Sequence, residues 1–242
     1  MRKIVVLAVS LAFLIPAASF AHTSSCRLTV IAGGEERPEY FARGTTYVEA
    51  LRGREYTLRV SNPTPYRVAV ALSVDGLNTI DARHTDGWNA AKWVLEPYES
   101  ADIDGWQVSD STARRFVFTG ERRSYGAALG QTDNLGVIEA VFYRERPRQI
   151  AEEREGMEAP APSAMERRKS SDDYAATGMG NRTQHDVTRV DIDLDPRPIA
   201  SVRIRYEFRP QLVKLGVLDR DPSPLERREK ARGFERYCPE PD

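Results

Sequence analysis

The chain has 242 residues, of which 35 are basic and 36 acidic, and its net charge is −1 at pH 7. A balance this close to zero argues against general nucleic-acid binding, which depends on a positive surface that neutralises phosphates. We therefore expect no nucleic-acid partner.

The first 21 residues predict export. Arg2 and Lys3 precede an apolar run over residues 4–18, and residues 19–21 offer small side chains around a cleavage point. This pattern is typical of a secretory signal peptide, and the run is too short to serve as a membrane anchor. No second long apolar run follows. We expect a mature periplasmic or extracellular chain that begins at His22 and has no transmembrane segment.

Two cysteines, Cys26 and Cys238, lie close to the two ends of the mature chain. In an oxidising compartment this arrangement predicts one disulfide that joins them. The residues leave open a lipid on Cys26 as the alternative, although residues 23–25 lack the leucine that such sites usually carry.

Residues 66–74 predict the central strand of a β-sandwich. Large apolar side chains alternate there with small ones, so a strand would have both faces covered. Asp75 and Gly76 then supply the turn that ends it. A half-buried strand over residues 55–60 precedes it, and the strong turn at residues 61–65 predicts that the two strands form a hairpin.

Further strands are expected over residues 27–32, 45–50, 92–95, 101–108, 114–119, 136–144, 190–195 and 199–208. Turn signals recur at short intervals between them, a pattern typical of sandwiches and barrels. We therefore predict a single all-β domain, an antiparallel β-sandwich of the jelly-roll or Ig-like type.

The composition changes at Arg146. Residues 146–188 contain prolines and many charges but almost no large apolar side chains, so we predict a mobile, disordered insert within the domain. Near the end of the chain, Ser223 begins a capping box and Gly233 provides a stop, which together predict a short charged helix over residues 224–232.

Three histidines are candidate ligands for copper. An exported β-sandwich whose mature chain begins with His22 resembles the lytic polysaccharide monooxygenases and their histidine brace. The resemblance implies that the α-amine and ring of His22 would bind one copper together with His84 or His185. Thr23 stands where that family often has glycine.

Acidic turns offer oxygen donors for calcium. Asp75, Asn78 and Asp81 lie in one turn region, and residues 102–105 form a second. Neither matches the loop of an EF-hand, and turn residues that bond their own backbone are the simpler interpretation. We predict no resident cofactor, with copper and calcium as the two alternatives.

The three tryptophans differ in their setting. Trp93 and Trp106 fall in predicted strands and are expected in the core. Trp88 lies in a polar loop, where we expect it to be exposed and available to stack on a sugar ring.

Five motifs, in order, resemble a family of exported bacterial proteins that has no known activity. They are SVDGLNTID (73–81), IDGW (103–106), RFVFT (115–119), SYGA (124–127) and NLGVI (134–138). The resemblance implies one domain and no particular activity. The loops that contain these motifs either set the fold or line a shared binding face. Candidate binding residues are Asp75, Asn78, Asp81, Trp88, Ser124, Tyr125 and Asn134.

Our first prediction for function is a non-enzymatic binding or structural module of the cell envelope, whose partner is a protein or a glycan. One alternative is a secreted metalloprotein that acts on a polymer through copper at His22. The other is a carbohydrate-binding module that uses Trp88.

Overall fold

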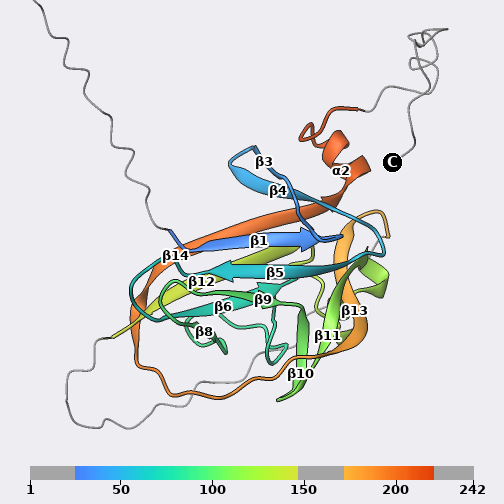
Figure 1. Cartoon of the computed structure of the whole chain (residues 1–242). Helices are drawn as coiled ribbons and strands as arrows, with labels where there is room; N and C mark the ends of the chain where they lie inside the picture. Colours follow the sequence, from blue (N-terminus) through green and yellow to red (C-terminus); the bar gives the residue numbers. More distant parts are fainter. Residues whose placement is uncertain (1–24, 147–171, 221–242) are drawn as a thin grey trace, which may run out of the picture.

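The structure is a computed structural model that describes residues 25–146 and 172–220 (Figure 1). Two β-sheets pack face to face, which confirms the predicted all-β sandwich. The predicted signal peptide, much of the predicted insert and the predicted helix over residues 224–232 lie outside the described residues.

Sheet A contains seven strands. They are β1 (Arg27–Ala32), β2 (Glu35–Glu36), β5 (Glu55–Ser61), β9 (Ser100–Ile103), β10 (Gly105–Ser109), β11 (Thr112–Gly120) and β13 (Ala175–Gln184). β1 pairs antiparallel with β5, with Val30 opposite Leu58. β11 joins β5 to the far end of the sheet, where it also pairs with β10 and β13.

Sheet B also contains seven strands. They are β3 (Glu39–Ala42), β4 (Thr45–Ala50), β6 (Val68–Val74), β7 (Leu77–Asn78), β8 (Trp93–Leu95), β12 (Val137–Glu145) and β14 (Leu194–Phe208). β14 lies between β4 and β12 and runs parallel to β4, whereas we expected antiparallel pairing throughout. Parallel neighbours need a long connection, and most of the chain separates these two strands.

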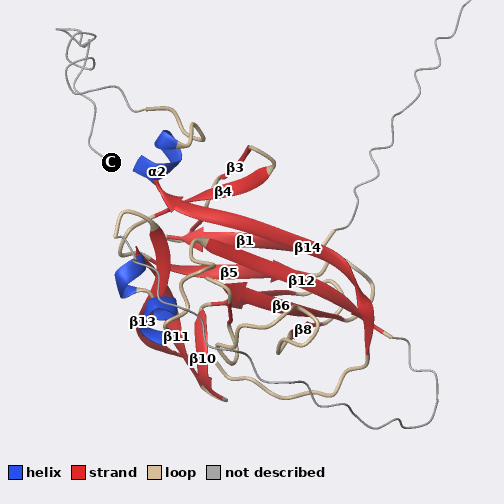
Figure 2. Ribbon diagram, turned by 180° about the vertical axis from the view of Figure 1, so that it is seen from behind, coloured by secondary structure: helices blue, strands red, loops and turns tan. Residues whose placement is uncertain are grey.

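Short helices lie at the edge of the sandwich (Figure 2). The 3₁₀ turn η1 (Glu121–Arg123) and the helix α1 (Tyr125–Leu129) follow β11, and α2 (Arg209–Lys214) continues directly from β14. In the described residues neither α-helix is long and apolar enough to cross a membrane.

The strand β6 confirms the prediction of a strand with two covered faces, and it lies between β12 and the short strands β7 and β8 rather than at the centre of sheet B. Val68, Val70, Leu72 and Val74 point into the main core, each fully buried. Burial of side chains of this size contributes roughly 1.5–3 kcal/mol each. On the other face Ala71 packs with Ala90 and Tyr143 beneath the loop that follows β7, which explains why small residues alternate with large ones.

The predicted hairpin between β5 and β6 is wrong, because these strands belong to different sheets. The turn between them carries the chain across the sandwich. Asn62, which is buried, holds this crossing: its Nδ2 donates to the carbonyls of Tyr66 (2.8 Å) and Glu96 (2.9 Å). Its Oδ1 accepts from the backbone N–H of Thr64 at 3.0 Å. The turn predicted over residues 61–65 is present, but the residues of a turn do not specify which sheet the next strand joins.

The prediction of a mobile insert over residues 146–188 is also wrong in part, because β13 falls within this range and pairs along β11. Its buried residues Ala175, Ala176, Thr177 and Gly178 are small, so the segment lacks the large apolar pattern that predicts a strand. The remainder of the insert, residues 147–171, lies outside the described residues.

The sequence predicted one strand over residues 101–108, and the structure has two strands there. The segment over residues 101–108 divides at Asp104, because β9 pairs with β5 while β10 pairs with β11. Asp104 fixes the change of partner: its carbonyl accepts from the N–H of Phe116 (2.9 Å), and its carboxylate accepts from the hydroxyl of Thr57 (2.7 Å).

Cys26, just before β1, is buried in the main core. Its predicted disulfide partner, Cys238, lies outside the described residues. The disulfide therefore stays a prediction.

Candidate functional site

The turn after β6 places Asp75 inside the protein, where it is only 2 % exposed. Its carboxylate accepts hydrogen bonds from the backbone N–H groups of Gly136 (2.8 Å) and Thr177 (2.7 Å) and from the hydroxyl of Tyr206 (2.5 Å). Asp75 has a φ of 54°, a left-handed conformation that aspartate adopts more readily than most residues. The sequence predicted a turn residue that is a candidate for ligand binding, and the structure shows that this turn residue is buried.

The bonds of Asp75 extend into a polar network between the two sheets. The Thr177 hydroxyl is 2.7 Å from the Tyr206 hydroxyl and 2.6 Å from the Tyr56 hydroxyl. Tyr56 and Thr177 come from sheet A, whereas Tyr206 belongs to sheet B. The network therefore fastens one sheet to the other within an aromatic cluster in which Tyr56 stacks on Phe118.

Burial raises the pKa of Asp75 from its ordinary value of 3.8 to about 7, although four hydrogen bonds lower it. Burial likewise raises the pKa values of Tyr56 and Tyr206, and the neighbouring charge of Asp75 adds to the effect. Near neutral pH the network can therefore hold or release one proton. Buried hydrogen-bonded carboxyls of this kind stabilise a fold only while every donor and acceptor is satisfied.

The other two residues of the predicted acidic turn bond to nearby backbone. Asn78 is buried: its Nδ2 donates to the carbonyl of Ala91 (2.8 Å), and its Oδ1 accepts from the N–H of Ile80 (2.8 Å). Asp81 is exposed and accepts from the N–H of Arg83 at 3.1 Å. Both side chains form hydrogen bonds with nearby backbone groups, which is the simpler of the two interpretations given for this acidic turn.

The loop over residues 124–134 contains α1, which the sequence analysis missed. Ser124 caps this helix, because its Oγ accepts from the N–H of Ala127 at 3.0 Å. Tyr125 places its ring against Trp106, with 5.0 Å between the centroids. Gly130 ends the helix in a left-handed conformation. A serine and a glycine that bracket five residues were the signal that could have predicted the helix.

The structure brings the two predicted binding loops together at one end of the sandwich. Gly76 lies against exposed Asn134: a β-carbon built on Gly76 would be only 2.7 Å from the Asn134 Cβ. Asp75, Asn78 and Ser124, by contrast, are buried. The shared face that the sequence predicted is therefore made of loop surface, and three of its predicted residues are inside the protein.

The histidines considered as copper ligands have different surroundings. The Nδ1 of His84 is 2.8 Å from the carbonyl oxygen of Gly76. The Nδ1 of His185 is 2.8 Å from the Gln107 Oε1, and its ring lies 5.4 Å from that of Trp93. His22 lies outside the described residues. Across residues 25–146 and 172–220, no group of three or more His, Cys, Asp or Glu side chains is arranged to hold a metal ion.

Trp88 is exposed, as predicted, with 41 % of its surface open to solvent. Its ring meets that of Tyr143 edge-on, with centroids 5.4 Å apart. The ammonium group of Lys92 lies 5.6 Å from the Trp88 ring and 5.3 Å from the Tyr143 ring. We call Asp86, Trp88, Asn89, Lys92 and Tyr143 the tryptophan platform.

Polar contacts hold the platform in place. The Oδ1 of Asp86 accepts from the backbone N–H groups of Trp88 (2.9 Å) and Asn89 (3.0 Å), and its Oδ2 accepts from the Asn89 amide (2.7 Å). Hydrogen bonds from Asn89 hold the pKa of Asp86 below its ordinary value. Lys92 donates to the carbonyls of Trp88 and Ala90. The tryptophan is therefore presented on a fixed loop.

The other tryptophans confirm the predicted core positions. Trp106 is fully buried and meets the ring of Phe116 edge-on. Trp93 is partly buried against the core and donates from its Nε1 to the hydroxyl of Thr79 at 2.9 Å. Of the three, Trp88 alone presents much of its surface to solvent.

Comparisons of the chain with protein-family models, with curated proteins and with solved structures gave no match. The resemblance to exported bacterial proteins, and the resemblance to the copper enzymes, remain predictions.

Proposed function

We propose that this protein is an exported, non-enzymatic binding module of the cell envelope, and that it binds a glycan by stacking a sugar ring on Trp88. The observation that carries the proposal is the exposed indole of Trp88, held by its own loop over Tyr143. Export is supported by the apolar run over residues 4–18, which has the length and flanks of a signal peptide.

A fixed aromatic surface suits sugar binding. One face of a pyranose ring is largely C–H, and an indole offers a broad apolar plane with little rotamer freedom to lose. The loop is already ordered by Asp86 and Lys92, so binding has little loop entropy to overcome. Lys92 lies beside the indole and Asn89 follows Trp88 in the chain, and both side chains are potential donors to sugar hydroxyls.

The test is retention of the purified protein on insoluble cellulose, chitin and peptidoglycan, followed by titration with soluble fragments of whichever polymer retains it. We expect Trp88→Ala to weaken binding roughly tenfold or more, the loss expected when a stacked ring is removed. Trp88→Tyr, which keeps an aromatic plane, should retain most of the affinity.

Phe41→Ala is the matched control, because Phe41 is an exposed aromatic residue on β3 with 79 % of its surface open. This variant should bind like the wild type. If Phe41→Ala and Trp88→Ala lose affinity equally, or if none of the three polymers retains the wild-type protein, the proposed glycan function is wrong. Thermal unfolding of each variant would show that the folded state is intact.

A further inference from the structure

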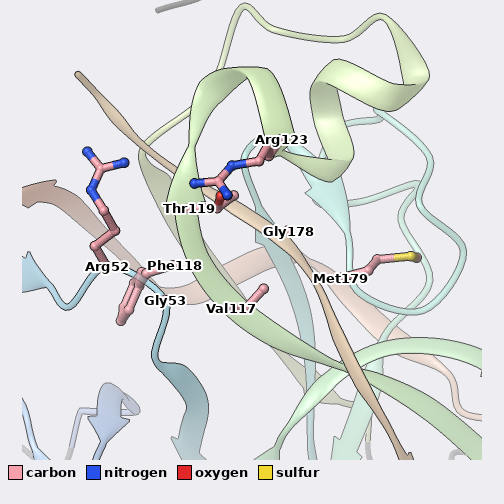
Figure 3. Close-up of a pocket in the computed structure, with 8 residues that line it drawn as sticks. All are labelled: Arg52, Gly53, Val117, Phe118, Thr119, Arg123, Gly178 and Met179. Carbon is pink, nitrogen blue, oxygen red and sulfur yellow. The ribbon is translucent and has the colours of Figure 1, made fainter. Parts of the chain in front are cut away.

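A hollow of about 300 Å³ opens on sheet A at the opposite side of β11 from the core (Figure 3). Its walls come from the β4–β5 loop, from β11, from η1 and from β13. The residues that line it are Arg52, Gly53, Val117, Phe118, Thr119, Arg123, Gly178 and Met179. Its volume is at the lower end of the range found for small-molecule sites.

The pairing of β11 with β13 explains why there is a hollow at this point. Val117 lies opposite Gly178 in the ladder, so one side of the pair has no side chain. A β-carbon at Gly178 would lie 3.2 Å from the Thr119 Cγ2 and 3.3 Å from the Val117 Cγ1. The missing side chain leaves a floor formed by the Gly178 backbone and by half-buried Val117, whereas the Met179 side chain packs against the main core.

The hollow carries two positive charges and no negative one. Arg52, Arg123 and Thr119 all line the hollow, and Figure 3 shows the two arginine side chains on either side of the β11 ribbon. None of the described residues that line the hollow is acidic. Among the residues that the structure describes, neither arginine forms an ion pair, whereas ten other arginines do.

Arg52 is held in position without being neutralised. Its Nη2 donates to the backbone carbonyl of Asp172 at 2.9 Å, and its guanidinium carbon lies 3.8 Å from the centre of the Phe208 ring. A guanidinium group that uses a carbonyl and an aromatic face still has donors and a full charge for an anion. Arg123, on η1, supplies a second guanidinium group from the other side of the hollow.

We propose that this hollow binds a small ligand through an oxyanion, a phosphate or a carboxylate group, with an apolar part of the ligand lying over Val117. Two guanidinium groups can form paired charge-assisted hydrogen bonds to such a group, and the Thr119 hydroxyl adds a neutral donor. The site lies on sheet A and is separate from the tryptophan platform on sheet B, so it goes beyond the proposed glycan function.

The test is calorimetric titration of the full chain at low ionic strength with phenyl phosphate, inorganic phosphate and benzoate. We expect binding of one equivalent, weakened by added sodium chloride because salt screens the charges. Stronger binding of phenyl phosphate than of benzoate would identify phosphate as the preferred oxyanion, and the reverse order would identify carboxylate. Stronger binding of phenyl phosphate than of inorganic phosphate would support the apolar contact.

Arg123→Gln is the decisive variant, because Arg123 is exposed and its removal breaks no ion pair within the described residues. We expect it to weaken binding about tenfold, as loss of a charge-assisted bond predicts. Arg122→Gln is the matched control: Arg122 is the exposed neighbour on the same 3₁₀ turn and does not line the hollow. It should change the affinity less than about twofold.

A second variant tests whether the ligand occupies the hollow itself. Val117→Ala keeps both arginines but removes part of the apolar floor of the hollow, so it should weaken the binding of phenyl phosphate more than that of inorganic phosphate. If Arg122→Gln and Arg123→Gln weaken binding equally, the anion is attracted by general surface charge and the proposed site is wrong. Absence of binding by all three probes to the wild-type protein would also overturn it.

Discussion

The hydroxyl of Tyr206 donates a hydrogen bond to the carboxylate of Asp75, across 131 positions of sequence and inside the core. Tyr206 lies on β14 and Asp75 directly follows β6, both strands of sheet B, and Thr177 links the two residues to sheet A through its backbone N–H and its hydroxyl. The stability of the sandwich therefore depends on the protonation of one carboxyl group.

We predict that the stability of the protein falls as the pH rises from about 4 to about 7. In the folded state the pKa of Asp75 is raised from 3.8 to about 7. Between these values the folded protein keeps a proton that the unfolded chain has released. The contribution of this group is complete below about pH 4 and is lost as the pH rises through about 7. Linkage gives a change of roughly 4 kcal/mol, measured by urea unfolding across this range.

The variant Asp75→Asn isolates this effect. Asparagine also tolerates a positive φ, but it has no charge to gain and leaves one backbone N–H without its acceptor. It should lower the free energy of unfolding by about 1–3 kcal/mol at about pH 5 and flatten the pH dependence. Glu39 and Glu207, whose pKa values are also raised by burial, contribute equally to both proteins and cancel in the difference. Parallel pH curves would mean that Asp75 is ionised in the folded protein.

We predict that Tyr206→Phe lowers the free energy of unfolding by about 1–3 kcal/mol, because it removes the hydroxyl that contacts both Asp75 and Thr177. The lost bond also held down the pKa of Asp75, so stability should continue to fall to a higher pH than in the wild type. Tyr66→Phe is the matched control, since the Tyr66 hydroxyl has no hydrogen bond to the described residues. Urea unfolding of both variants at several pH values makes the comparison. A loss as large in the control would show that the effect is not specific to the network.

We predict that the protein recovered from an exporting host, without reducing agent, consists of residues 22–242 and is lighter by two hydrogens. Native intact-mass measurement checks both the cleavage site and the Cys26–Cys238 disulfide. Added mass of one copper ion would support the alternative at His22, and a lipid-sized addition on Cys26 would replace the disulfide. A chain that begins at another residue would contradict the predicted cleavage and, with it, the copper alternative.

Much of the sheet structure could be predicted from local patterns. The alternation at Val68–Val74 indicated a strand with two covered faces, and the structure places both faces against other layers. The polar loop around Trp88 likewise indicated exposure. Such features depend on residues close in sequence, which is why they could be predicted.

Features set by distant partners could not be predicted. Nothing near Asp75 reveals that Tyr206 and Thr177 will surround it, so the sequence indicates only a turn residue and a candidate for ligand binding. The small residues of β13 carry no strand pattern of their own, because β11 determines their pairing. The arginine hollow has the same origin, since it exists only where Gly178 meets Val117.

The position of β14 has a consequence for how the chain matures. This strand lies between β4 and β12, yet of the strands that the structure describes it is the last in the order of synthesis. Until residues 194–208 are available, β4 has only the short β3 beside it, and sheet B remains in two parts. Because such distant pairings form slowly, the growing chain is kept from closing early. The export proposed above would benefit from this arrangement, because a chain that folds late has time to reach the membrane before the sandwich closes.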